Sequence, residues 1–269
     1  MKFGIKQEKF QELLEKLMMR DIYPSSIIST KNGAMFSIQR AGKGRALRYA
    51  KFNNSYFDFI DNSSESIEFD VEKNLPLIKE IPAGMLLIIE TKDGKFTVER
   101  WITDDKGKPI TKKGCSYLNY KEPEGEVKDS LPFEMKDGVP LVGEGKVPLS
   151  TVFTINLTSL KEITTFGKTN TLKTEFYKFL FETADGAKKL AMRVGDLHAF
   201  STWDVAYPIS EIKSGDVLDV IFTYGIPQIA DIYRQNNVTF QTSTNCPAFI
   251  FESCDQYILG MLIPPYTPE

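Results

Sequence analysis

The chain has 269 residues, of which 42% are hydrophobic, and a formal net charge of −3 at neutral pH. This length accommodates one large domain or two ordinary domains with real hydrophobic cores. No run of eighteen apolar residues and no signal sequence are evident, which argues against a membrane segment and predicts a folded, soluble, intracellular protein. The acidic balance also argues against bulk affinity for nucleic acid, although it does not locate the positive charges.

A strand followed by a helix recurs four times along the chain, starting near residues 3, 67, 152 and 217. Alternating or dense apolar residues predict the strands, and apolar residues at helical spacing predict the helices. The four copies are strand 2–6 with helix 7–20, strand 66–71 with helix 75–81, strand 151–157 with helix 159–166, and strand 217–222 with helix 224–234.

The meanders between these units are predicted to be antiparallel strands. Turn dipeptides such as Asn32-Gly33, Asp93-Gly94 and Asp185-Gly186 favour hairpins at several of the junctions. The predicted strands are 25–29, 34–40, 46–52, 56–61, 85–90 and 95–102 in the first half, and 176–182, 187–194, 199–206, 238–242, 247–252 and 257–263 in the second. The pattern indicates an α+β protein with about four short helices.

The interval between the second and third copies is about twenty residues longer than the other two. The excess falls within residues 121–150, which are rich in proline, glycine and charge and typical of a surface connector. We therefore expect an N-terminal domain over 1–120, a connector over 121–150 and a similar C-terminal domain over 151–269.

Each predicted helix has one apolar stripe to bury, so the helices should cover one side of the sheets. At 100° per residue, the first helix places three basic side chains within a stripe about 40° wide, and its glutamates lie further round. The basic residues on or just beyond the four helices are Lys9, Lys16, Arg20, Lys79, Lys161, Lys168 and Arg234. Such faces can bind an anionic partner, or they can simply be solvated.

The residues that most often carry chemistry form no convergent set. Cys115, Cys246 and Cys254 lack the paired spacing of a zinc site and are expected to be buried or partly buried free thiols. His198 is the single histidine, so a site with several histidine ligands is excluded. Asp104-Asp105 lies in a stretch typical of a solvated hairpin tip, and residues 42–45 lack the spacing of a phosphate-binding loop. We predict no catalytic residues, no metal and no cofactor.

In overall pattern the chain resembles the ring-shaped DNA sliding clamps of the proliferating cell nuclear antigen (PCNA) family. The resemblance rests on the fourfold strand, helix and meander unit, on the long central connector, and on residues 220–224, 245–252 and 262–265. It implies the DNA clamp fold: two similar domains of antiparallel sheets with two helices each, forming an arc that closes into a ring, usually a trimer.

The same resemblance implies a function without catalysis. The ring would encircle duplex DNA independently of sequence, with the basic helix residues as neighbours of the phosphates, in a prokaryotic cytoplasm or in a eukaryotic nucleus or viral factory. A groove would receive short peptide motifs from DNA polymerase, the clamp loader and other replication and repair proteins. The matching groove residues are Leu131, Pro132 and Phe133 on the connector with Pro247, Leu262, Ile263 and Pro264.

Two alternatives remain open at the level of sequence. An apolar cluster on a loop can pack against its own domain instead of a partner. The long connector, and a last helix whose predicted basic residue is Arg234, also fit a clamp-fold interaction scaffold or one subunit of a mixed ring.

Overall fold

The computed structural model divides the chain into two compact units. Unit 1 comprises Met1–Ala41, Arg48–Asp129 and Ser253–Leu259, and unit 2 comprises Gly42–Leu47, Ser130–Glu252 and Gly260–Glu269. The structure describes residues 1–17, 25–41, 46–63, 65–92, 95–118, 120–121, 133–136, 139–143, 145–169, 176–184, 187–195, 202–207, 211–214, 219–222, 233, 236–243 and 246–263.

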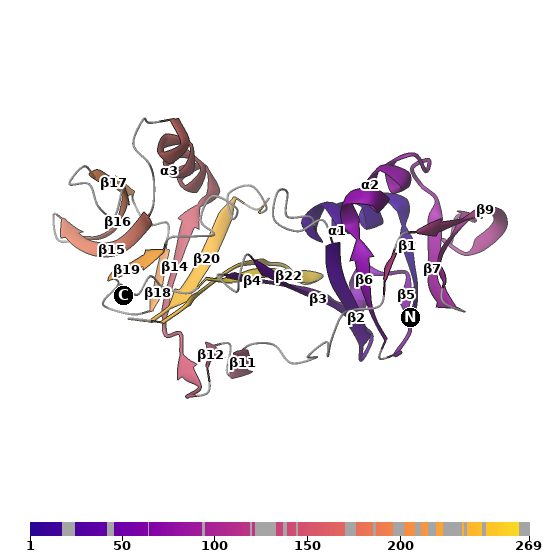
Figure 1. The fold of residues 1–269 in the computed structure, drawn as a ribbon, viewed down its shortest axis with the longest axis horizontal. Coiled ribbons are helices and arrows are strands. Elements are labelled where there is room, and N and C mark those ends of the chain that lie inside the picture. The colour runs from indigo at the N-terminus through magenta and orange to yellow at the C-terminus, as the bar shows by residue number, and fades with distance from the viewer. Residues whose placement is uncertain are drawn as a thin grey trace. The chain divides into compact units, whose positions relative to one another are not determined.

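Unit 1 contains two sheets and two helices (Figure 1). The first sheet has the order β5-β1-β7-β8-β9, and the second has the order β10-β6-β2-β3-β4 followed by β22. The elements are β1 (Lys2–Lys6), α1 (Gln7–Leu17), β2 (Ser25–Lys31), β3 (Ala34–Ala41), β4 (Ala46–Phe52), the 3-10 turn η2 (Asn54–Tyr56), β5 (Phe59–Ile60), β6 (Ser66–Asp70), α2 (Val71–Lys79), β7 (Leu86–Lys92), β8 (Lys95–Thr103), β9 (Pro109–Leu118), β10 (Tyr120–Lys121) and β22 (Tyr257–Ile263), whose last four residues belong to unit 2.

The core of unit 1 is built on α1, whose apolar stripe is buried as the sequence predicts. The Phe10 ring lies 6.0 Å from Phe3 of the first sheet and 6.4 Å from Phe69 of the second. Phe69 in turn lies 5.2 Å from Phe96 on β8. One helical residue therefore contacts both sheets, which fixes the face that α1 turns away from the core.

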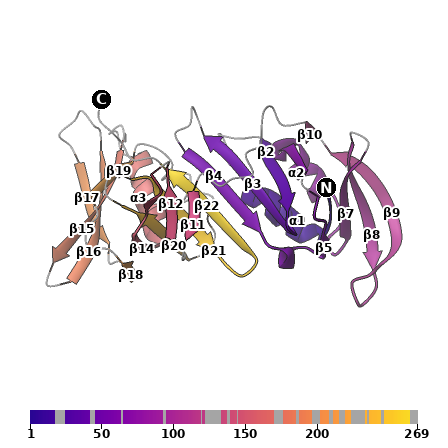
Figure 2. The same cartoon turned by 90° about the horizontal axis from the view of Figure 1, so that it is seen from below.

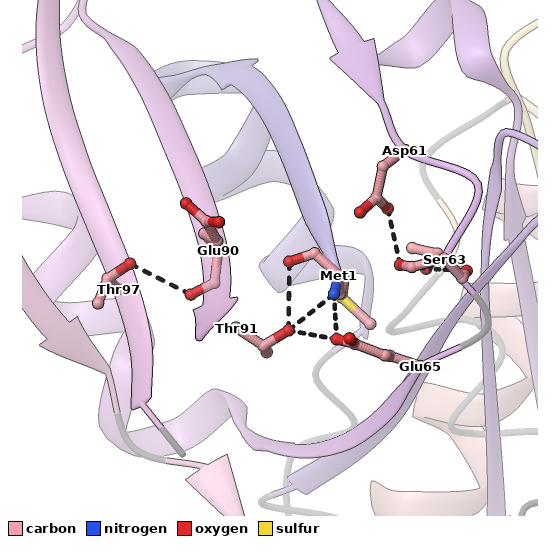
Figure 3. A network of polar contacts seen from close by, with 8 residues as sticks. Met1, Asp61, Ser63, Glu65, Glu90, Thr91 and Thr97 are labelled. Atoms are coloured by element: carbon pink, nitrogen blue, oxygen red, sulfur yellow. Dashed lines mark hydrogen bonds and ion pairs between the residues drawn. The ribbon is translucent and has the colours of Figure 1, made fainter. Parts of the chain in front are cut away.

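The polar residues around the start of β1 form a small network (Figure 3). The amino group of Met1 donates to Glu65 and, over 2.8 Å, to the Thr91 hydroxyl. Hydrogen bonds from the amino group and from Thr91 hold the pKa of the Glu65 carboxyl below its usual value. Ser63 donates to Asp61 over 2.8 Å, and Thr97 donates to the carbonyl of Glu90 over 3.2 Å. These contacts tie β1 to β7 and to the segment before β6.

Two predicted elements of unit 1 differ from the structure. The second helix begins at Val71 rather than at residue 75, because Asp70 caps it by accepting a hydrogen bond from the backbone N–H of Lys73 over 2.9 Å. The strand predicted over 56–61 is wrong for most of its length. Tyr56 and Phe57 are both buried, and consecutive residues of a strand cannot both face the same core, so the chain forms η2 there and only the short β5.

Unit 2 also combines two main sheets with a helix. Its sheets have the orders β17-β16-β15-β19 and β21-β20-β14-β18, with the end of β22 beside β21. The elements are β14 (Thr151–Asn156), α3 (Leu157–Thr169), β15 (Phe176–Ala184), β16 (Ala187–Gly195), β17 (Thr202–Tyr207), β18 (Glu211–Ser214), β19 (Asp219–Phe222), β20 (Asn237–Thr242) and β21 (Ala248–Ser253). The predicted helix over 224–234 lies outside the described residues except for Tyr233.

Aromatic rings from three strands fill the core of unit 2. Phe153 on β14 stacks on Phe240 of β20 at 5.0 Å and meets Phe181 of β15 edge-on at 5.4 Å. Phe179 lies 5.6 Å from Phe240. The buried Tyr233 donates its hydroxyl hydrogen to the carbonyl of Ile250 over 2.6 Å. As in unit 1, the helix follows directly after a strand, here β14.

The connector contains a small sheet of its own, with the order β11-β12-β13. Its strands are β11 (Phe133–Lys136), β12 (Val139–Val142) and β13 (Val147–Pro148). Ser243 in unit 2 donates to the carbonyl of Pro148 over 2.7 Å and accepts from the backbone N–H of Ser150 over 3.1 Å. The carboxyl-terminal part of the connector is therefore attached to the body of unit 2.

Candidate nucleic-acid interface and partner groove

The first helix carries its basic residues in two different environments. Lys9 is half-buried, and its Nζ lies 5.4 Å from the centre of the Tyr56 ring. Lys16 is only 6% exposed. Its Nζ lies 3.2 Å from Glu12, donates to the Tyr257 hydroxyl over 3.2 Å, and sits 4.4 Å from the centre of the Tyr257 ring.

The burial of Lys16 argues against the prediction that it borders DNA. Its ammonium already has a carboxylate and an aromatic ring as partners, so it has no open path to a phosphate. The aromatic cluster around it, in which Phe52 lies 4.9 Å from Tyr56 and 6.0 Å from Tyr257, anchors β22 within unit 1. We therefore leave Lys16 out of the proposed interface and assign it to packing.

The second helix lies beside the first, and the two are joined by polar contacts (Figure 1). Lys79 in the last turn of α2 lies 3.1 Å from Glu15 of α1, with both side chains well exposed. Gln7 donates to the carbonyl of Ile78 over 2.9 Å. The helical spacing predicted that the glutamates of α1 lie away from the basic stripe, and it could not predict this ion pair, because the pair joins residues on two helices.

The third helix offers an exposed lysine in unit 2. Asn156 precedes α3 and accepts a hydrogen bond from the N–H of Thr158 over 2.8 Å, which starts the helix. Lys161 lies one turn further on and is exposed. Lys168 belongs to α3 by its backbone, while Arg20 and Arg234 lie outside the described residues.

Within the described residues, each unit therefore offers fewer available helix cations than the sequence suggests. Lys9, Lys79 and Lys161 are reachable from solvent, and Glu15 partly neutralises Lys79. An exposed pair of this kind is weak and is screened by salt, so Lys79 can exchange its carboxylate for a phosphate.

The predicted partner groove falls on β21, β22 and the connector. Ile263 is 0% exposed and faces the core, so its side chain cannot contact a partner directly. Leu262, its neighbour on β22, points to the opposite face of the sheet and is half-exposed, as is Pro247. Phe133 begins β11 by its backbone, and Leu131, Pro132 and Pro264 lie outside the described residues.

Two phenylalanines that the prediction did not include complete the apolar character of that opposite face. Phe249 and Phe251 on β21 stack at 5.2 Å. The Phe249 ring also covers Gly260 on β22. A Cβ added at Gly260 would clash with this ring, because it would lie closer to the ring atoms than van der Waals contact allows. Alternation along the strand from the buried Ile250 is the signal that could have identified them.

The cysteines are free thiols, as predicted, but their predicted burial is wrong for two of them. Cys115 is exposed on β9 and Cys254 is exposed in the turn between β21 and β22, while Cys246 is half-buried. Within the described ranges, no three or more His, Cys, Asp or Glu side chains are arranged to hold a metal ion. None of the described helices is long and apolar enough to cross a membrane.

Comparison with known proteins identifies the fold. No family model matches the chain, and no curated protein matches it in sequence. A crystal structure of proliferating cellular nuclear antigen from Entamoeba histolytica aligns with a TM-score of 0.71 at 12% identity, over 99% of this chain and 98% of that one. A. fulgidus PCNA, solved with the C-terminal region of FEN-1 bound, aligns with a TM-score of 0.68 at 9% identity, over 100% and 99% of the two chains. The chain thus has the α+β fold of PCNA, the sliding-clamp fold, along its whole length.

Proposed function

We propose that this protein is a DNA sliding clamp: a ring, built from three copies of the chain, that encircles duplex DNA and tethers replication and repair enzymes. The observation that carries the proposal is the likeness of fold to PCNA over nearly the full length of both chains. Two domains joined by the connector would form each subunit's share of the ring.

The exposed helix lysines suit such a role. Lysine contacts to phosphate carry no sequence information and can pass from one phosphate to the next, so a ring can slide while it stays bound. Lys9, Lys79 and Lys161 would supply these contacts, together with Arg20, Lys168 and Arg234. Retention would then depend on topological linkage rather than on high affinity, which is compatible with the acidic net charge of the chain.

Free sheet edges support assembly into a ring. Among the described strands, β9 with ten residues and β17 with six are the longest that end a sheet. Unpaired backbone N–H and C=O groups at such an edge pair readily with another chain. Pairing of β9 on one copy with β17 on the next would repeat head to tail, and such a contact closes into a ring when the rotation permits.

The partner groove would lie on the outer face of β21 and β22, next to the connector. Leu262, Pro247 and Phe251 are half-exposed there, and Phe251 stacks on Phe249, which is only 3% exposed. Apolar surface of this kind fits short motifs with aliphatic and aromatic anchors, such as those expected on a polymerase or a clamp loader. In this proposal the chain itself catalyses no reaction.

The decisive experiment separates topological retention from ordinary binding. The protein is incubated with a linear duplex tethered at one end, the free end is capped with a bulky protein, and the salt concentration is raised. We expect retention only when the cap is added before the salt, and release when the duplex is cut. Light scattering should give three times the mass of one chain.

Matched variants connect that result to the helices. Replacing Lys79 and Lys161 together by glutamate should reduce loading, whereas the same change at Lys106, which lies in the turn between β8 and β9, should leave it unchanged. A strictly monomeric protein, or retention that does not depend on the cap, would exclude a clamp built from this chain alone.

A second candidate function is an interaction scaffold or one subunit of a mixed ring. The pairing of Lys16 with Glu12 and of Lys79 with Glu15 favours it, because both pairs reduce the positive charge available to DNA. In that case the chain alone would not be retained on capped DNA, and mixing it with related subunits would restore both assembly and retention.

A further inference from the structure

An arginine near the free edge of the unit 1 sheet lies in an unusual position. Arg100 on β8 is in direct register with Gly114 on β9. β9 is the last strand of the first sheet of unit 1 and lies beside β8 (Figure 2). The preceding residues of the same face, Phe96 and Val98, are buried in the core. Because side chains alternate along a strand, Arg100 points to the core side of the sheet, at its margin.

Glycine at position 114 allows the guanidinium to lie across the edge strand. A Cβ added at Gly114 would be 3.1 Å from Cζ of Arg100 and 3.2 Å from its Nε, closer than an ordinary contact. The φ angle of Gly114 does not lie in the left-handed region, so no backbone conformation there requires glycine. The missing side chain instead makes room for Arg100 to reach toward the open edge.

The guanidinium lacks an acceptor within the described part of the subunit. Its Nε is buried and has no hydrogen-bond partner there, and no described carboxylate forms an ion pair with Arg100. Leaving a charged donor unsatisfied is costly, and arginine pairs most strongly with a carboxylate that accepts two parallel hydrogen bonds. Because Nε is buried, an acceptor from another molecule can reach only the two terminal Nη groups of Arg100, which can together bind both oxygens of a carboxylate.

The edge itself indicates which molecule. On β9, Ile110 is 61% exposed and Tyr117 is 64% exposed. The strand therefore presents exposed apolar side chains as well as the unpaired backbone groups of a sheet edge. A strand added to β9 would run about 4.8 Å away, with side chains opposite Gly114 about 5 Å from it. That distance is within reach of a guanidinium already lying over the glycine.

We infer that Arg100 is a subunit-interface residue, whose guanidinium passes over Gly114 to bind a carboxylate on the edge strand of a second copy of this chain. The inference rests on the proposed ring. It adds a side-chain contact that would fix how β9 of one copy is aligned with the edge strand of the next. Lysine would serve less well, because an ammonium cannot make the bidentate contact.

The test compares subunit association in three variants by sedimentation equilibrium over a dilution series. Arg100→Gln should weaken association at least tenfold, and Arg100→Lys should weaken it less. Lys113→Gln, which removes an exposed cation from β9 next to Gly114, is the control and should change association little. Far-UV circular dichroism and the urea midpoint of each variant verify that the subunit remains folded. Gly114→Ala should reproduce the Arg100→Gln defect if it folds.

The possible outcomes are distinguishable. If the native chain associates and Arg100→Gln associates equally well, the inference is wrong while the proposed ring stands. Unchanged association with weaker binding to duplex DNA would assign Arg100 to a phosphate instead. A native chain that stays monomeric at every concentration would overturn the proposed ring as well.

Discussion

Replacing Phe10 by alanine should remove a large part of the stability of unit 1. The side chain is 1% exposed, and its ring contacts Phe3 and Phe69 on two different sheets. Truncation of a buried phenylalanine costs about 3–5 kcal/mol, because transfer free energy is forfeited and a cavity is left behind. This is a large part of the roughly 5–15 kcal/mol that stabilises a typical domain. The fraction of molecules in which unit 1 is unfolded, with α1 and Lys9 out of position, should rise accordingly.

The chain provides a reporter for that measurement. It has two tryptophans, Trp101 in unit 1 and Trp203 in unit 2. In a Trp203→Phe background, tryptophan fluorescence during urea unfolding therefore follows unit 1 alone. With a denaturant slope of about 2 kcal/mol per molar, the midpoint should fall by roughly 2 M.

The control is Leu77→Ala on α2, a residue that is 48% exposed. Its truncation should cost less than about 1 kcal/mol, because surface substitutions away from the core have small effects. If Phe10→Ala shifts the midpoint no more than Leu77→Ala, then α1 does not join the two sheets and the interpretation of the core is wrong.

Three further predictions follow from individual side chains. Lys16→Met should leave the salt dependence of DNA binding unchanged, whereas Lys161→Met should reduce its slope by about one for each phosphate that is no longer neutralised. Tyr233→Phe removes a buried hydrogen bond to a backbone carbonyl and should lower the unfolding free energy by about 1 kcal/mol, as measured by urea unfolding. Hydrogen bonding from Lys112 holds the pKa of Glu99 below its usual value, although burial opposes this. The resulting stabilisation is therefore present above the ordinary glutamate pKa and is lost as pH falls through the lowered one, so the midpoints of wild type and Glu99→Gln should converge in acid.

The sequence was most informative where one face of an element is buried. Alternation identified β6 and β20 to within a residue or two, a dense apolar run identified β22, and helical spacing identified the apolar stripe of α1. These patterns arise because burial imposes the period of the element on its apolar residues. The fourfold recurrence of strand and helix indicated the clamp fold, which the comparison with PCNA confirms.

The sequence was uninformative where neither face of a strand is buried. Residues 109–113 of β9 are all exposed, so this half of the strand shows no alternation, and the strand was not predicted. Only its hydrogen bonds to β8 reveal it. The short strands of the connector were not predicted either: β12 does alternate between half-buried and buried residues, but over only four residues.

The spacing of apolar residues along the chain determined which face of each strand or helix is buried. It therefore determined the order of strands and helices and the class of fold. Only the tertiary structure decided which charges remain available. It buried Lys16 against Tyr257, paired Lys79 with a glutamate from another helix, and opened a path for Arg100 across Gly114. The reason is physical: periodicity depends on neighbours within one element, whereas the surroundings of a charge depend on side chains from elements far apart in the sequence.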